Sequence, residues 1–158
     1  MNKLFFKIKT IFLIFMVTAC SYKPIFIQKE YGFEITNILF VGDSEINGLI
    51  DNKLNLIKNK KDNTKRQFDL SIETKKKKNI ISQDSKGDPL KYELIIIAKF
   101  EVKENGNLIL NRKLEKNNIY NNKSDKFELE RSEYIIIENI SDKISEDIIS
   151  SIVNLDDN

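Results

Sequence analysis

The sequence contains no histidine and no tryptophan, and its 158 residues include one cysteine, two prolines and five glycines. Without histidine, the chain lacks the commonest general base of enzymes and the commonest zinc ligand. No imidazole is available to activate a serine, and no Gly-x-Ser-x-Gly motif is present. Aspartates and glutamates are abundant but scattered, without a pairing that identifies a general acid and base. We therefore expect a protein that is not an enzyme and that uses no metal or cofactor.

The single cysteine excludes an internal disulfide, even in an oxidising compartment. The position of this cysteine in the sequence is also informative. The first nine residues carry three lysines and no acid, residues 11–17 are apolar, and the small residues Thr18 and Ala19 come directly before Cys20. The apolar run is too short to cross a bilayer, which takes about 20 residues. This order predicts a bacterial lipoprotein signal peptide over residues 1–19 that is cleaved before Cys20.

Cleavage there would leave Cys20 as the lipid attachment site, with its thiol diacylated and the new amino terminus acylated. The competing interpretation is a free or buried thiol at the end of an ordinary signal peptide. Two or more acyl chains hold a protein firmly on a membrane, whereas one binds marginally. Because Ser21 stands where inner-membrane lipoproteins typically carry aspartate, we expect an anchor in the outer membrane, on the periplasmic side.

The charge balance changes when the leader is removed. Without residues 1–19 the chain has 139 residues, and its basic residues fall from 26 to 23 against 24 acidic ones. A nearly neutral exported domain has no evident nucleic-acid partner. The remaining length suits one compact domain. We expect a lipidated tether over residues 20–32 and a single domain over residues 33–158.

Hydrophobic periodicity predicts the first half of that domain. Alternation over residues 33–41 predicts a strand, and Gly42-Asp43-Ser44 ends it and offers a helix N-cap. Apolar residues at helical spacing predict a helix over roughly 44–59. A second strand is expected around Phe68, Leu70 and Ile72, fading into Lys75 to Lys78. Residues 82–89 are then predicted to form a turn.

The second half begins with the strongest strand pattern, residues 90–102. Its middle is apolar on both sides through Ile95 and Ile97, which predicts a central place in the sheet. Asn105-Gly106 predicts a tight hairpin, and the return strand is expected to reach about residue 117. A long helix follows Asp125, with Tyr134 on its apolar stripe and Ser141, Glu146 and Asp147 facing away. The order predicts an α+β two-layer sandwich, β-α-β-β-β-α, with two helices on one face of a mainly antiparallel sheet of about four strands.

Three features together resemble a known family. They are the lipobox Thr18-Ala19-Cys20, the block Gly87-Asp88-Pro89 with Tyr92-Glu93-Leu94, and Tyr120-Asn121 shortly before the long last helix. This pattern is similar to the lipopolysaccharide-assembly lipoprotein LptE family, particularly its alphaproteobacterial form. The resemblance implies a two-layer lipoprotein that binds and plugs a large outer-membrane β-barrel of the LptD type. The complex would deliver lipopolysaccharide to the outer leaflet.

Family members also bind lipopolysaccharide through basic residues, but no local motif fixes those positions here. Arg112 and Lys113, on the return strand, are the candidates because such side chains suit phosphate groups. They could equally be a solvated strand face. Lys75 to Lys78 could bind anionic headgroups, although a lysine-protected strand end is the simpler interpretation. The alternative function is a generic envelope lipoprotein that serves as adaptor or chaperone for another complex.

Overall fold

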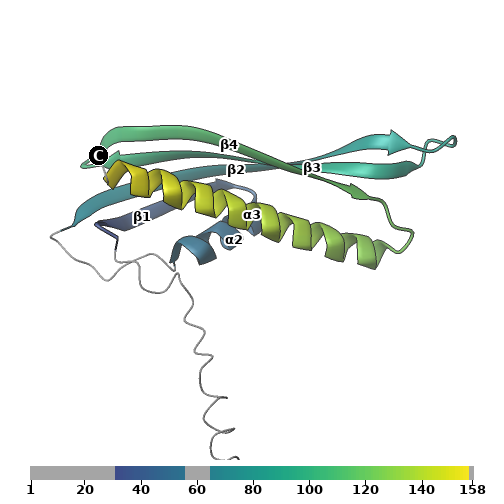
Figure 1. Cartoon of the computed structure of the whole chain (residues 1–158), viewed down its shortest axis with the longest axis horizontal. Helices are drawn as coiled ribbons and strands as arrows, with labels where there is room; N and C mark the ends of the chain where they lie inside the picture. Colours follow the sequence, from purple (N-terminus) through teal and green to yellow (C-terminus); the bar gives the residue numbers. More distant parts are fainter. Residues whose placement is uncertain (1–30, 56–64, 157–158) are drawn as a thin grey trace, which may run out of the picture. The chain divides into compact units, whose positions relative to one another are not determined.

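The computed structural model describes residues 31–55 and 65–156 of the chain. The described elements follow the predicted order β-α-β-β-β-α (Figure 1). They are β1 (Phe33–Gly42), α2 (Ser44–Asn55), β2 (Arg66–Gln83), β3 (Pro89–Glu104), β4 (Asn107–Asn121) and α3 (Lys126–Asp156). The helix predicted over 44–59 is therefore described as far as Asn55, and its last predicted positions lie outside the described residues.

The four strands form one mixed sheet in the order β1-β2-β3-β4. β1 and β2 are parallel, with Ile38 opposite Leu70, and α2 lies in the crossover between them. The other two pairings, β2 with β3 and β3 with β4, are antiparallel. The prediction of a mainly antiparallel sheet is confirmed, and so is the central place of β3.

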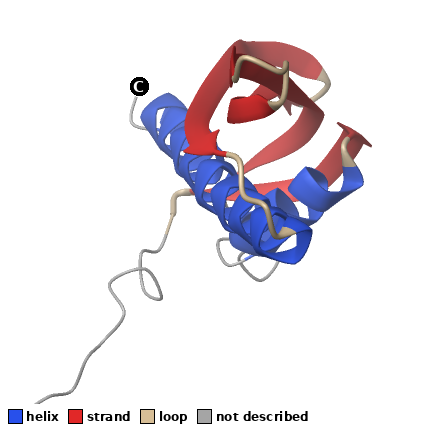
Figure 2. Cartoon of the chain, turned by 90° about the vertical axis from the view of Figure 1, so that its right-hand side faces the viewer, coloured by secondary structure: helices blue, strands red, loops and turns tan. Residues whose placement is uncertain are grey.

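Both helices pack on the same face of the sheet (Figure 2). That face carries the alternate, even-numbered side chains of the two inner strands, which pack against isoleucines of both helices. The strands contribute Phe68, Leu70, Ile72, Leu94, Ile96, Phe100 and Val102, and the helices contribute Ile46, Ile50, Ile140, Ile144, Ile148 and Ile152. The odd-numbered side chains of β2 and β3 point to the opposite face, here called the uncovered face. No helix of the described residues lies over it.

Helix α2 begins at a junction held by Asp43. The Asp43 carboxylate oxygen Oδ1 accepts hydrogen bonds from the backbone N–H groups of Glu45 and Ile46, both at 3.2 Å. This is the predicted N-cap, which satisfies donors that a helix start leaves without partners. The Asp43 N–H in turn donates to the Thr74 carbonyl at 3.3 Å. The turn from β1 into α2 is therefore fastened to the middle of β2.

Helix α3 is capped in a similar way by Asp125, whose Oδ1 accepts from the N–H groups of Phe127 at 2.8 Å and Glu128 at 3.3 Å. Two of its predicted side-chain orientations were wrong. Ser141 is 1% exposed and is therefore buried, not solvent-facing. Tyr134 is 48% exposed, because α3 runs on well beyond the shorter α2 (Figure 1).

Strand β2 does not fade at its lysines but continues to Gln83. The pairing with β1 ends at Gly42 opposite Thr74, so the sheet beyond Thr74 has three strands. We call this part the far end; it comprises residues 75–83 of β2, 89–97 of β3 and 115–121 of β4. Within the described part of the chain, no helix is long and apolar enough to span a membrane.

Candidate functional site

The predicted lipid attachment site, Cys20, lies outside the described residues, as does most of the predicted tether. Tyr31, near the end of that tether, packs against the core, and its ring centroid is 5.2 Å from that of Phe33. Lipidation of Cys20 therefore stays a prediction from the leader. The described domain offers its surfaces as the remaining candidates for function.

The structure does not bring Arg112 and Lys113 together. Neighbouring residues of a strand point to opposite faces of the sheet. Arg112 lies on the helix side, where its Nη1 donates to the Ser151 hydroxyl of α3 at 3.2 Å. Lys113 lies on the uncovered face and forms an ion pair with Glu115 at 2.8 Å. A phosphate group bound to one face of the sheet could therefore contact only one of these two side chains directly.

The four successive lysines of β2 are divided between the faces in the same way. On the helix side, Lys76 Nζ lies 2.8 Å from a Glu45 carboxylate oxygen and 3.5 Å from one of Asp43. Partial burial acts to lower the pKa of Lys76, but the hydrogen bond to Glu45 and the charge of Asp43 outweigh it and raise the pKa. On the uncovered face, Lys75 forms an ion pair with Glu73 at 2.8 Å. The run is therefore not one basic patch.

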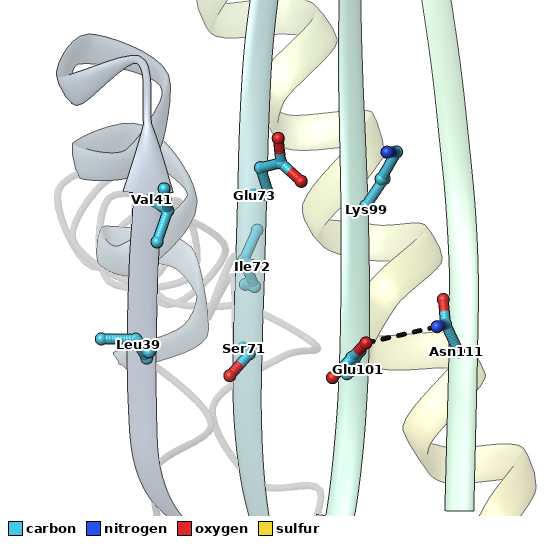
Figure 3. A pocket seen from close by; sticks show the side chains of 8 residues that line it. All are labelled: Leu39, Val41, Ser71, Ile72, Glu73, Lys99, Glu101 and Asn111. Carbon is cyan, nitrogen blue, oxygen red and sulfur yellow. Dashed lines mark hydrogen bonds between the residues drawn. The ribbon is translucent and has the colours of Figure 1, made fainter. Parts of the chain in front are cut away.

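The uncovered face carries a shallow depression of about 370 Å³ over β1 to β4 (Figure 3). Two exposed apolar side chains of β1 form one side of it. The rest is formed by polar or charged residues of the other strands together with the core residue Ile72. The lining residues are Leu39, Val41, Ser71, Ile72, Glu73, Lys99, Glu101 and Asn111. Asn111 donates to Glu101 at 3.3 Å across its floor.

Charges of both signs alternate across this face. The pKa of Glu73 is lowered by its hydrogen bond from Lys75, by the charge of Lys75 and by that of Lys99. The pKa of Glu115 is likewise lowered by its hydrogen bond from Lys113 and by that lysine's charge. Because the lysines are interleaved with carboxylates, the face offers mixed polar contacts and not a concentrated anion site. Among the described residues, no group of three or more potential ligands could hold a metal ion.

A second polar cluster lies on the helix side of the far end. Lys78 forms an ion pair with Glu133 of α3, and its Nζ lies 4.1 Å from the centroid of the Tyr92 ring. Tyr120 packs against Tyr92 at 5.7 Å and donates its hydroxyl proton to Glu133 at 2.8 Å. Burial, together with the hydrogen bond to Glu133, raises the pKa of Tyr120 above its ordinary range. These polar contacts hold the first half of α3 against the sheet. They lie before the core isoleucines of α3, which begin at Ile137.

Sequence reasoning missed this cluster as a unit. Tyr92 and Tyr120 were singled out as family-like motifs, and they do face each other across β3 and β4. Glu133, the shared partner of Tyr120 and Lys78, lies on another element, at a distance in sequence that no local spacing reveals. The alternation of the lysine run was the available signal, because it places Lys78 on the same face as Tyr92.

The fold and these surfaces define the class of protein: a two-layer α+β domain with one uncovered sheet face. Solved structures of bacterial lipoproteins share this fold. Rare lipoprotein B from Shewanella oneidensis has a TM-score of 0.54 at 20% identity, covering 75% of this chain and 98% of that chain. The minor lipoprotein from Acinetobacter baumannii has a TM-score of 0.54 at 16% identity, with 77% and 92% covered.

Lipoprotein B from Nitrosomonas europaea is similar as well, with a TM-score of 0.52 at 12% identity, covering 80% of this chain and 86% of that chain. At these identities the likeness establishes the fold. No protein-family model matches the chain, and no curated protein sequence matches it. The fold is thus shared with envelope lipoproteins, in agreement with the broader part of the resemblance found in the sequence.

Proposed function

We propose that this chain is an outer-membrane lipoprotein, anchored through Cys20, that binds and plugs a large β-barrel of the LptD type to deliver lipopolysaccharide to the outer leaflet. The observation that carries the proposal is the coincidence of two independent features. The leader ends in a lipobox, and the domain behind it has a fold that spans 98% of rare lipoprotein B. In this role the protein is not an enzyme.

The surface chemistry supports a plug. The lumen of an outer-membrane barrel is polar, so a plug needs a polar and rigid exterior. The uncovered face provides paired charges such as Lys113–Glu115 and Lys75–Glu73, both at 2.8 Å. Strands β2 and β4 position these groups, and sites on such regular elements are held more precisely than sites on loops.

The alternative is an envelope lipoprotein that serves as adaptor or chaperone for a different complex. The names of the similar structures support the adaptor function and the barrel-plug function equally, because they state that those proteins are lipoproteins and give no partner. The two functions differ in the protein that would be found bound to the chain.

The partner test is a pull-down of the C-terminally tagged full chain from outer membranes in mild detergent, followed by mass spectrometry. The proposal predicts one large β-barrel in stoichiometric amount. Recovery of the chain alone, or with inner-membrane or periplasmic partners, would contradict the barrel assignment and favour the adaptor function.

The anchor is tested separately by labelling cells with palmitate. Cys20→Ser should abolish incorporation, whereas the matched variant Ser21→Ala should keep it. Ser21→Asp should keep the label but move the protein to the inner membrane. Unchanged labelling of Cys20→Ser would show that the leader is not a lipoprotein signal.

A further inference from the structure

The outer edge of β4 is the longest strand edge without a neighbour in the described sheet. Strand β4 pairs with β3 on one side and lies at the margin of the strand order. It has 15 residues, or about 50 Å, and contains no proline. Such an edge presents backbone N–H and C=O groups that can pair with another chain. The free edge of β2 at the far end, by contrast, carries the run Lys75 to Lys78.

Outward from Leu114, β4 carries oppositely charged side chains at the first position on either side and identical ones at the third. Lys113 and Glu115 flank the centre with opposite charges. Asn111 and Asn117 come next on the same face. The match ends there, because the register of β4 shifts between Leu110 and Leu108. This stretch of β4 is complementary to itself. If two copies pair antiparallel about a two-fold axis at Leu114, residue 113 of one copy lies opposite residue 115 of the other, and residue 111 lies opposite residue 117.

We propose that β4 pairs with β4 of a second copy of this chain, antiparallel and centred on Leu114. In this register Lys113 of each copy lies opposite Glu115 of the other, so that the pairing forms two ion pairs. Asn111 lies opposite Asn117, where side-chain amides can hydrogen-bond to each other. Cross-strand pairs of opposite charge and between hydrogen-bonding groups stabilise antiparallel strands.

The side chains involved are accessible. Lys113, Glu115, Asn111 and Asn117 are exposed on the uncovered face, and Ile119 is 57% exposed. Their bonds within one copy are at the surface: Lys113 to Glu115 at 2.8 Å and Asn117 to Glu93 at 2.7 Å. Exposed bonds of this kind contribute little to stability, so exchanging them for bonds between copies costs little.

The helix layer permits the same arrangement. Helix α3 contacts both β3 and β4, so the α3 helices of the two copies would lie on the same side of the joined sheet. On this side Arg112 would come opposite Lys116, but Lys116 is neutralised by Asp147 at 2.8 Å.

Disulfide trapping tests the register. Full chains carrying Asn111→Cys and Asn117→Cys, with different tags, are expressed together, and the membranes are oxidised. The pairing predicts a dimer that carries both tags, because directly opposed strand residues lie within disulfide range. Each variant expressed alone is the control, since its own cysteines would be about 20 Å apart. Equal cross-linking of the single variants, or none in the mixture, would overturn the proposal.

Charge exchange tests the energetics by sedimentation equilibrium of the detergent-extracted full chain. Lys113→Glu places like charges opposite each other twice and should raise the dimer Kd about tenfold. The double variant Lys113→Glu with Glu115→Lys should restore the wild-type Kd. Lys75→Glu is the matched control, because it removes a similar ion pair on the same face of β2. A monomeric wild type, or a Kd insensitive to Lys113→Glu, would refute the pairing. The dimer does not depend on the proposed function.

Discussion

A Cβ atom added to Gly42 would lie 2.0 Å from the carbonyl oxygen of Thr74, which no side chain can tolerate without a shift of the backbone. Gly42 also has a φ of +104°, in the region that favours glycine. Thr74 is fully buried, and its Oγ1 donates to the Asn47 side-chain oxygen at 2.6 Å. The end of β1, the start of α2 and the middle of β2 therefore meet at this one contact.

Replacing Gly42 with alanine should reduce the free energy of unfolding by about 3 kcal/mol, because the backbone strain and the clash with Thr74 add together. Urea denaturation followed by circular dichroism measures this change. Gly106→Ala is the matched control: φ is +79°, and a Cβ there would meet no atom within 4 Å. The control should lose about 1 kcal/mol from conformation alone. Equal losses in the two variants would mean that Thr74 does not restrict Gly42.

Gly48→Ala should raise the free energy of unfolding, in contrast to Gly42→Ala. This glycine lies inside α2, and a Cβ atom there would meet nothing within 4 Å. Alanine is favoured over glycine inside a helix by up to about 1 kcal/mol. We expect the urea midpoint to rise by a corresponding amount. A lower midpoint would indicate that residue 48 contacts something that the described residues do not include.

The raised pKa of Tyr120 predicts a loss of stability at alkaline pH. The folded state holds the hydroxyl proton more tightly than the unfolded chain, in which the pKa is near its ordinary value of 10.0. The stabilisation is therefore complete below pH 10 and is lost as the pH rises above it. Tyrosinate absorbance should show a group that ionises well above pH 10, and Tyr120→Phe should remove that group. An unchanged titration in Tyr120→Phe would contradict the assignment.

On the acid side, Glu104 should contribute stability at neutral pH. The bidentate contact of the Arg66 guanidinium, at 2.9 and 3.0 Å, lowers the pKa of Glu104 below its ordinary value of 4.5. The contribution is present above pH 4.5 and is lost as the pH falls through the lowered folded-state pKa. Urea midpoints measured from pH 7 to pH 3 should fall less steeply for Glu104→Gln than for the wild type. Identical slopes would show that the contact does not alter protonation.

Arg112 and Lys113 should respond differently to truncation, because they lie on opposite faces. Arg112→Ala loses the bond to Ser151 and should lower the free energy of unfolding by about 1 kcal/mol. Lys113→Ala should leave stability nearly unchanged. If lipopolysaccharide binds the uncovered face, Lys113→Ala should weaken binding of the full chain while Arg112→Ala does not. Equal effects of both variants on binding would exclude the uncovered face as the binding surface.

Most of the fold could be predicted because the strongest hydrophobic periodicities of the sequence correspond to strands and helices of the structure. The alternation in residues 90–102 predicted β3, and its doubly apolar middle predicted a central strand. The lysines of β2 misled the prediction, since Lys76 and Lys78 form ion pairs with Glu45 and Glu133 from the two helices. Those partners are 31 and 55 residues away in sequence, and no local pattern could reveal them.

The candidate site was less predictable, for two reasons. Arg112 and Lys113 were grouped by their proximity in sequence, although the alternation of a strand already separates them. Ser141 was placed in solvent because serine is polar, but its side chain is buried. Its neighbour Ser145 donates to the Ser141 backbone carbonyl at 2.8 Å, which satisfies its own hydroxyl inside the helix.

The parallel pairing of β1 with β2 has a consequence for the order of folding. Strands β2, β3 and β4 are joined by short turns, so their contacts are close in sequence. Strand β1 can pair only after the crossover that contains α2 has closed, and such non-local contacts form late because loop closure costs entropy. We therefore expect a three-strand meander to form early and β1 to join last. Until then, the inner edge of β2 is open to any other extended segment that competes for the place of β1.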